Sequence, residues 1–177
     1  MTGALVLLGL AGCGKPAAVA SSSTSAPAPA ATTSTVSTST PVSTDRLCDL
    51  IQASFKDVLP PDPKRNTRIT NSCTVGGGPI GQPRVAQVRV SYSTFGGTTP
   101  DELKFMRNND PKTKDAPALG AGSFSSVYAG DTTMAKLGFT TAKNGRLLII
   151  EIEPARALTP ADTDKATTAA KALFDAL

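Results

Sequence analysis

The sequence predicts one α+β domain, in which a mainly antiparallel sheet packs against two or three helices, preceded by a segment outside the fold. Three observations predict this class. Stretches with apolar residues at helical spacing occur along the chain together with stretches in which apolar and polar residues alternate. The dipeptide Asn144-Gly145 separates two of the alternating stretches, as in a tight antiparallel hairpin. All 14 acidic residues lie in 45–177, which is long enough for one domain with its own core.

The segment before the domain begins with a motif typical of bacterial lipid attachment. A short apolar run, 4–9, leads into Leu10-Ala11-Gly12-Cys13, and this run is too short to cross a bilayer as a helix. We therefore expect 1–12 to be a signal peptide and Cys13 to be the lipidated residue that anchors the chain to the outer face of the cell membrane. Chance occurrence of the motif in an Ala-rich chain is the alternative. Since no Lys or Arg precedes the apolar run, we expect that Met1 is not the natural start of the signal.

The stretch 13–44 has the composition of a linker. After Cys13 it consists mainly of Ser, Thr, Ala and Pro, and Lys15 is its only charged residue. Such a stretch buries too little apolar surface to offset the entropy of ordering it, so we expect disorder. A plain spacer is the favoured interpretation, and an O-glycosylated stalk is the alternative.

The first part of the domain shows one helical and two strand patterns. Apolar residues at helical spacing predict a helix over 45–59, ended by Pro60-Pro61. A strand is expected over 67–75, followed by a glycine-rich turn, and a second strand with strict alternation around 87–92.

The next signals predict a helix followed by a strand. Thr99 and Glu102 have the spacing of a capping box, and Leu103 and Met106 of the helix that it opens should face the core. A strand should then end near Ala129.

The last part of the domain should be a hairpin and a helix. The hairpin should pair 132–143 with 146–153 around Asn144-Gly145, because both turn residues tolerate positive φ. The closing helix should begin after Thr159. Its buried stripe should comprise Ala166, Ala169, Ala170, Leu173 and Leu177.

Two cysteines lie inside the domain, Cys48 and Cys73. An exported chain reaches an oxidising compartment, so we expect these two to form a disulfide. Two thiols without histidine make a poor zinc site, and their spacing is not that of a redox pair.

Several short motifs together resemble the small actinobacterial cell-envelope lipoproteins that carry a domain of unknown function. They are the lipobox at Cys13 with its Ser/Thr/Pro stalk, and the segments Cys48-Asp49-Leu50-Ile51, Cys73-Thr74-Val75 and Leu119-Gly120-Ala121-Gly122. The resemblance implies a place in the cell envelope and a disulfide. It implies no activity.

The composition argues against several functional classes. The chain contains no histidine, which removes the usual general base and the common zinc sites. Gly120-Ala121-Gly122-Ser123 lacks the third glycine of a dinucleotide loop. Lys64, Arg65 and Arg68 form the only local basic cluster, which we interpret as part of a solvated loop. We expect no nucleic-acid partner, no metal and no organic cofactor.

Glu151 and Glu153 are weak candidate catalytic carboxylates. They alternate on a predicted strand, so they share a face and could act as acid and base on a sugar. A solvent-facing rim of the sheet is the favoured interpretation.

Three functional classes remain. The favoured one is a non-catalytic binding or accessory role in the envelope, with another envelope protein, a wall polymer or a lipid as partner besides the membrane itself. The first alternative, a carrier of a lipid or other apolar ligand, requires a cavity. A wall-acting hydrolase is the least favoured, because the sequence offers no obvious convergent set of catalytic groups.

Overall fold

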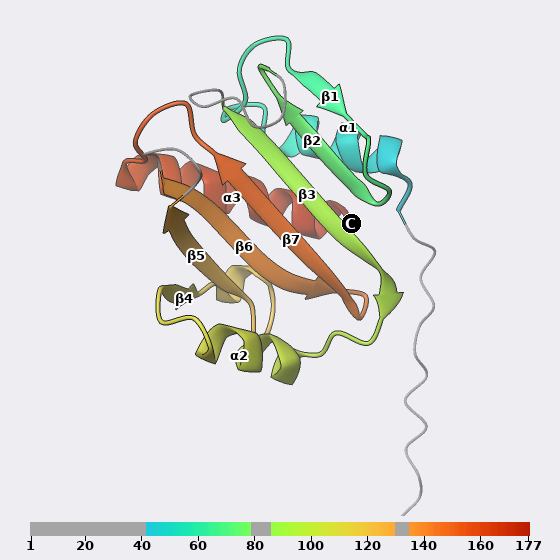
Figure 1. The fold of residues 1–177 in the computed structure, drawn as a ribbon, viewed down its shortest axis with the longest axis vertical. Coiled ribbons are helices and arrows are strands. Elements are labelled where there is room, and N and C mark those ends of the chain that lie inside the picture. The colour runs from blue at the N-terminus through green and yellow to red at the C-terminus, as the bar shows by residue number, and fades with distance from the viewer. Residues whose placement is uncertain (1–41, 79–85, 130–134) are drawn as a thin grey trace, which may run out of the picture. The chain divides into compact units, whose positions relative to one another are not determined.

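The structure is a computed structural model that describes residues 42–78, 86–129 and 135–177. Within these residues the chain forms a single α+β domain, as predicted (Figure 1). Its seven antiparallel strands have the order β1-β2-β3-β7-β6-β5-β4. Cys13, the signal peptide and nearly all of the linker lie outside the described residues, so their assignments stay predictions.

The elements follow one another in an order close to the predicted one. Their bounds are α1 (Thr44–Ser54), β1 (Lys64–Asn66), β2 (Ser72–Gly76), β3 (Gln87–Gly96), α2 (Pro100–Asn108), β4 (Thr113–Asp115), a 3-10 turn η1 (Pro117–Leu119), β5 (Phe124–Ala129), β6 (Ala135–Lys143), β7 (Arg146–Glu153) and α3 (Pro160–Ala176).

Local signals account for the hairpin and for two helix starts. β6 and β7 pair around Asn144 and Gly145, whose φ angles are 53° and 70°. Positive φ at both positions is what the type I′ turn requires. Thr99 opens α2 and Thr159 opens α3, each with a complete capping box.

Two predictions about the elements were wrong in detail, and two short strands were missed. α1 ends at Ser54, and the chain to Leu59 forms turns in which the Leu59 N–H donates to the Phe55 carbonyl. The expected strand over 67–75 is shorter, because Asn71 has a φ of 58°, which an extended strand does not allow. β1 and β4 were not predicted, because three-residue strands carry no alternating pattern.

The hydrophobic core lies between one face of the sheet and helices α1 and α3, which cross behind the sheet in Figure 1. The central strand β7 contributes Leu148, Ile150 and Ile152, all buried. Burial of one such side chain contributes ~1.5–3 kcal/mol. From α3 come three small residues and one large one, Ala166, Ala169, Ala170 and Leu173.

The predicted disulfide is present and joins a helix to the sheet. Cys48 in α1 and Cys73 in β2 are both fully buried, and their Cα atoms lie 5.5 Å apart. The bond therefore fixes α1 against the part of the sheet that β2 and β3 form.

Helix α2 lies at the lower end of the sheet in Figure 1 and is covered on one side only. Leu103 is fully buried, as predicted, but Met106 is 40% exposed, so its assignment to the core was wrong. The helix is short and stands at the end of the sheet, which leaves room for one buried residue but not for a stripe.

Candidate functional site

The face of the sheet opposite α1 and α3, here called the open face, carries charged and amide side chains side by side. β3 and β7 pair Gln87 with Glu153 and Arg89 with Glu151. Directly paired residues point to the same face of a sheet, so these four side chains are neighbours. With two contributions from β5 and β6 they form what we call the polar row: Gln87, Arg89, Tyr128, Lys136, Glu151 and Glu153.

Glu151 is half-buried and has two partners. The Tyr128 hydroxyl donates to its Oε1 over 2.7 Å, and Arg89 Nη1 lies 3.5 Å from its Oε2. Burial, with the hydrogen bond to Glu151 as a second cause, raises the pKa of Tyr128 far above its usual range. Gly138 makes room for the tyrosine, since an added Cβ would lie 3.2 Å from its ring.

Glu153 is 9% exposed and also has two partners. Gln87 Nε2 donates to its Oε2 over 2.8 Å, and Lys136 Nζ lies 3.3 Å from the same oxygen. Gly76 lies opposite Gln87, and an added Cβ there would lie 2.5 Å from the Gln87 Cβ. The position of Gln87 therefore depends on a glycine in the neighbouring strand.

These contacts correct the expectation of a solvent-facing rim. Glu151 and Glu153 do share one face, but the first is half-buried and the second is buried. The recess between their side chains has a volume of about 20 Å³. That is room for about one water molecule, so a sugar ring does not fit between the two carboxylates.

Two neighbouring shallow hollows lie on the open face and share Ser93 and Leu147, and we call them together the open-face groove. Its floor is formed by Leu147 and Ile149 of β7 with Ser91 and Ser93 of β3. Its walls are formed by three exposed apolar residues, Ile69 before β2 and Phe105 and Met106 of α2.

A partly enclosed cavity of about 230 Å³, here called the end cavity, lies where the turns after α1, the end of β7 and the start of α3 meet. Its apolar surface includes Val88, Ile152 and Ala166, which also belong to the core. Gln87 and Glu153 border it as well, at the ends of β3 and β7, while their side chains belong to the polar row on the open face.

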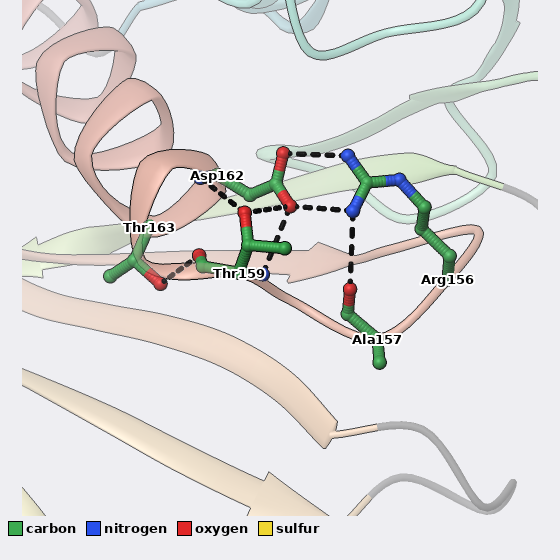
Figure 2. A network of polar contacts seen from close by, with 5 residues as sticks. All are labelled: Arg156, Ala157, Thr159, Asp162 and Thr163. Atoms are coloured by element: carbon green, nitrogen blue, oxygen red, sulfur yellow. Dashed lines mark hydrogen bonds and ion pairs between the residues drawn. The ribbon is translucent and has the colours of Figure 1, made fainter.

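A network at the start of α3 forms part of the wall of the end cavity (Figure 2). Arg156 pairs with both carboxylate oxygens of Asp162, at 2.8 and 2.9 Å. The Thr159 hydroxyl donates to the same carboxylate over 2.7 Å, and the Thr159 N–H donates over 2.9 Å. These three donors, of which the Thr159 hydroxyl has the largest effect, hold the pKa of Asp162 well below its usual range.

Other residues singled out in the sequence have structural roles. Arg65 of the basic cluster contacts Asp49 of α1 at 2.7 Å, so the cluster is not simply a solvated loop. Ser123 is buried, and its hydroxyl lies 2.9 Å from the Leu119 carbonyl and 2.6 Å from the Thr141 hydroxyl. This serine is enclosed in the fold and is not placed as an exposed nucleophile.

Among the residues that the structure describes, no three potential ligand side chains gather in a way that would hold a metal ion. In the same part of the chain, no helix combines the length and the apolar character needed to cross a bilayer.

The groove and the end cavity were not predicted from the sequence. One available signal was the position of Phe105 in its helix. At about 100° per residue, Phe105 lies about 200° around the helix from Leu103, so the two side chains cannot both face the core. The end cavity gives no such signal, because residues far apart in the chain surround it.

Comparison with protein-family models, with curated proteins and with solved structures finds no match.

Proposed function

We propose that this protein is a lipoprotein of the outer face of the cell membrane with a non-catalytic binding role, and that its partner is another envelope protein. The partner inserts apolar side chains into the open-face groove. The anchor is the lipid on Cys13, and the domain is the part that recognises the partner.

The observation that carries the proposal is the exposure of the groove walls. Phe105 is 71% exposed and Ile69 is 59% exposed, and they line two neighbouring hollows that share Leu147. Contiguous exposed apolar surface is typical of protein–protein contact sites. Phe and Met are enriched in such interfaces, and the flexible Met106 side chain adapts to different partners.

The polar row supports binding over catalysis. Each of its two carboxylates already has a cation and a second donor within reach. A general acid in glycoside hydrolysis must reach the leaving group, and both carboxylates contact neighbouring side chains beside a recess with room for about one water molecule.

The anchor and the disulfide support the same location. The sequence around Cys13 is typical of lipid attachment, and a buried disulfide is typical of proteins that fold outside the cytoplasm. A linker of about 30 residues keeps the domain near the membrane and raises its effective concentration toward a partner in the same envelope.

Site-specific photo-crosslinking in cells tests the proposal. A photoreactive amino acid replaces Phe105 in the groove wall or, as a matched control, exposed Lys171 of α3. We expect the Phe105 variant to crosslink one defined envelope protein, the Lys171 variant not to do so, and the additional change Leu147→Asp to abolish the product. Equal products from both positions would refute the groove as the contact. A product of twice the chain's own mass would identify a second copy as the occupant.

A second candidate function is supported by the end cavity. A partly enclosed cavity lined by both apolar and charged residues can hold a small ligand. Its volume of about 230 Å³ is too small for a two-chain lipid, so a carrier role would concern a smaller ligand.

A further inference from the structure

We infer that the partner segment that enters the open-face groove is cationic, with Lys or Arg side chains next to the apolar side chains that contact Phe105 and Met106. This inference rests on the proposed function and names the chemistry of its partner. It depends on the charges of the lining residues, whereas the proposed function depends on the exposure of the apolar ones. The two can therefore fail separately.

The charged residues of the groove lining are acidic. Among the described residues that line the two hollows, Asp101 and Glu102 carry a charge, and no Lys or Arg does. Both acidic side chains are exposed. The chain as a whole has a formal net charge of +4, so the sign of the lining is opposite to that of the molecule. Interfaces are arranged so that such a patch meets a patch of the opposite sign.

Helix α2 places each acid beside an exposed apolar side chain. Asp101 precedes Phe105 by four residues, and Glu102 precedes Met106 by the same spacing. Side chains at this spacing are neighbours on the surface of a helix, with Cβ atoms about 5–6 Å apart. An apolar group that packs against Phe105 or Met106 thus comes close to a carboxylate. A cation next to that group forms an ion pair as the apolar contact forms.

Positive charges near the groove do not cancel the two acids. Lys104 Nζ lies 3.8 Å from Asp101 Oδ1, but both side chains are largely exposed, so solvent screens this pair. The N-terminus of α2 contributes about half a positive charge. Arg146 Nη1 donates to the Ser93 carbonyl over 3.2 Å. Because Arg146 precedes Leu147 on β7, its side chain points to the opposite face of the sheet from the groove.

The same charges argue against two other occupants. In a symmetric dimer the same patch lies on both sides of the interface, so the acids of one copy would be brought toward those of the other. Like charges that face each other across an interface are unfavourable. An anionic lipid surface would be repelled for the same reason. The occupant that the charges favour is a cationic segment of another protein.

Photo-crosslinking from Phe105 in isolated membranes tests the inference, because these membranes contain the full chain together with its partner. The yield is compared at about 0.01 M and about 0.15 M salt, between which the Debye length falls from about 30 to about 8 Å. We expect the yield to fall about threefold or more, since charges at the rim of an interface act on association and on its salt dependence. Mass spectrometry of the product then locates the attached partner residue, and we expect a Lys or Arg within about four positions of it.

A pair of charge-removing substitutions isolates the effect of the acids. Asp101→Asn combined with Glu102→Gln removes both charges, and the glutamine side chain still completes the capping box of α2. This variant should give about threefold or more less product at the lower salt concentration and should lose the salt dependence. Asp57→Asn combined with Asp164→Asn is the matched control. It changes the net charge equally, and these exposed acids line neither hollow, so it should behave as the wild type.

The outcomes separate the inference from the proposed function. A yield that does not depend on salt, or a charge-removing variant that crosslinks as well as the wild type, would overturn the inference and leave the groove as a contact. An attached segment without Lys or Arg, or a product of twice the chain's own mass, would also overturn it. If Phe105 gave no specific product at all, the proposed function would fail and the inference with it.

Discussion

The hydroxyl of Tyr128 on β5 donates to Glu151 on β7 over 2.7 Å, across the intervening strand β6. The contact exists because Gly138 of β6 has no side chain to block the ring. One hydrogen bond thus links strands that are not neighbours, and it holds the half-buried carboxylate in place within the polar row.

This contact predicts an unusual tyrosine titration. The chain has two tyrosines, Tyr92 and Tyr128, and burial raises the pKa of both above 10.0. A raised folded pKa means that the folded protein holds the proton more tightly, so this contribution to stability is complete below about pH 10 and is lost as the pH rises further. Ultraviolet absorbance at pH 10.5 should show little tyrosinate in the folded protein and extensive ionisation in urea. Half-ionisation of the folded protein near pH 10 would contradict the prediction.

The start of α3 predicts acid-dependent stability. Thr159→Ala removes the hydroxyl that caps Asp162, and the loss of such a cap costs ~1 kcal/mol at neutral pH. The contacts of Asp162 lower its folded pKa below the unfolded value near 3.8, so their contribution is complete above that value and is lost as the pH falls through the folded pKa. The melting temperatures of the wild type and the variant should therefore differ at pH 7 and converge toward pH 2. Thr163→Ala, one turn later, is the control whose effect should not depend on pH.

The disulfide predicts a large loss of stability on removal. Cys48 and Cys73 are 25 residues apart in the chain, and closing a loop of this length stabilises the fold by ~3.5 kcal/mol on the chain-entropy model. The double change Cys48→Ala and Cys73→Ala should lower the melting temperature by on the order of 10 °C. Calorimetry with and without reductant checks this, since reductant should affect the wild type but not the double variant. A reductant-insensitive wild type would argue against the stabilising role.

The proposed lipid anchor predicts that replacing Cys13 releases the protein from the membrane. Cys13→Ala should remove the thiol that we propose carries the lipid, so the chain should no longer partition with membranes or incorporate a fatty-acid analogue. Metabolic labelling checks this, with Cys48→Ala as the control that should keep its label. A labelled Cys13→Ala protein would rule out the assignment.

The features that the sequence predicted well depend only on residues that are close together in the chain. Thr99 with Glu102 and Thr159 with Asp162 form their boxes within one turn, and Asn144-Gly145 forms its turn with no help from elsewhere. The fold class followed from such local signals, because each indicates one element and their order restricts the possible layers.

The features that the sequence did not predict depend on contacts between residues that are far apart in the chain. Glu153 is buried because Gln87 and Lys136, on the two flanking strands, offset the burial of its charge. The alternation of residues along β7 placed Glu153 on the correct face of the sheet. It could not show that Gln87 and Lys136 contact the carboxylate, so we expected Glu153 to face solvent. β4 likewise forms because it pairs with the backbone of β5, not because its own three residues favour an extended conformation.

The position of the disulfide also determines how the domain responds to mechanical force. Tension applied through the chain before Thr44 would enter the first turn of α1 and reach Cys48 almost at once. From there the covalent bond passes the load directly to Cys73 in β2, which is paired with β3 along five residues. The rest of α1 is thereby bypassed, and the load enters the sheet through β2. A domain held at one end by a membrane and at the other by a partner would thus resist unfolding where the load enters.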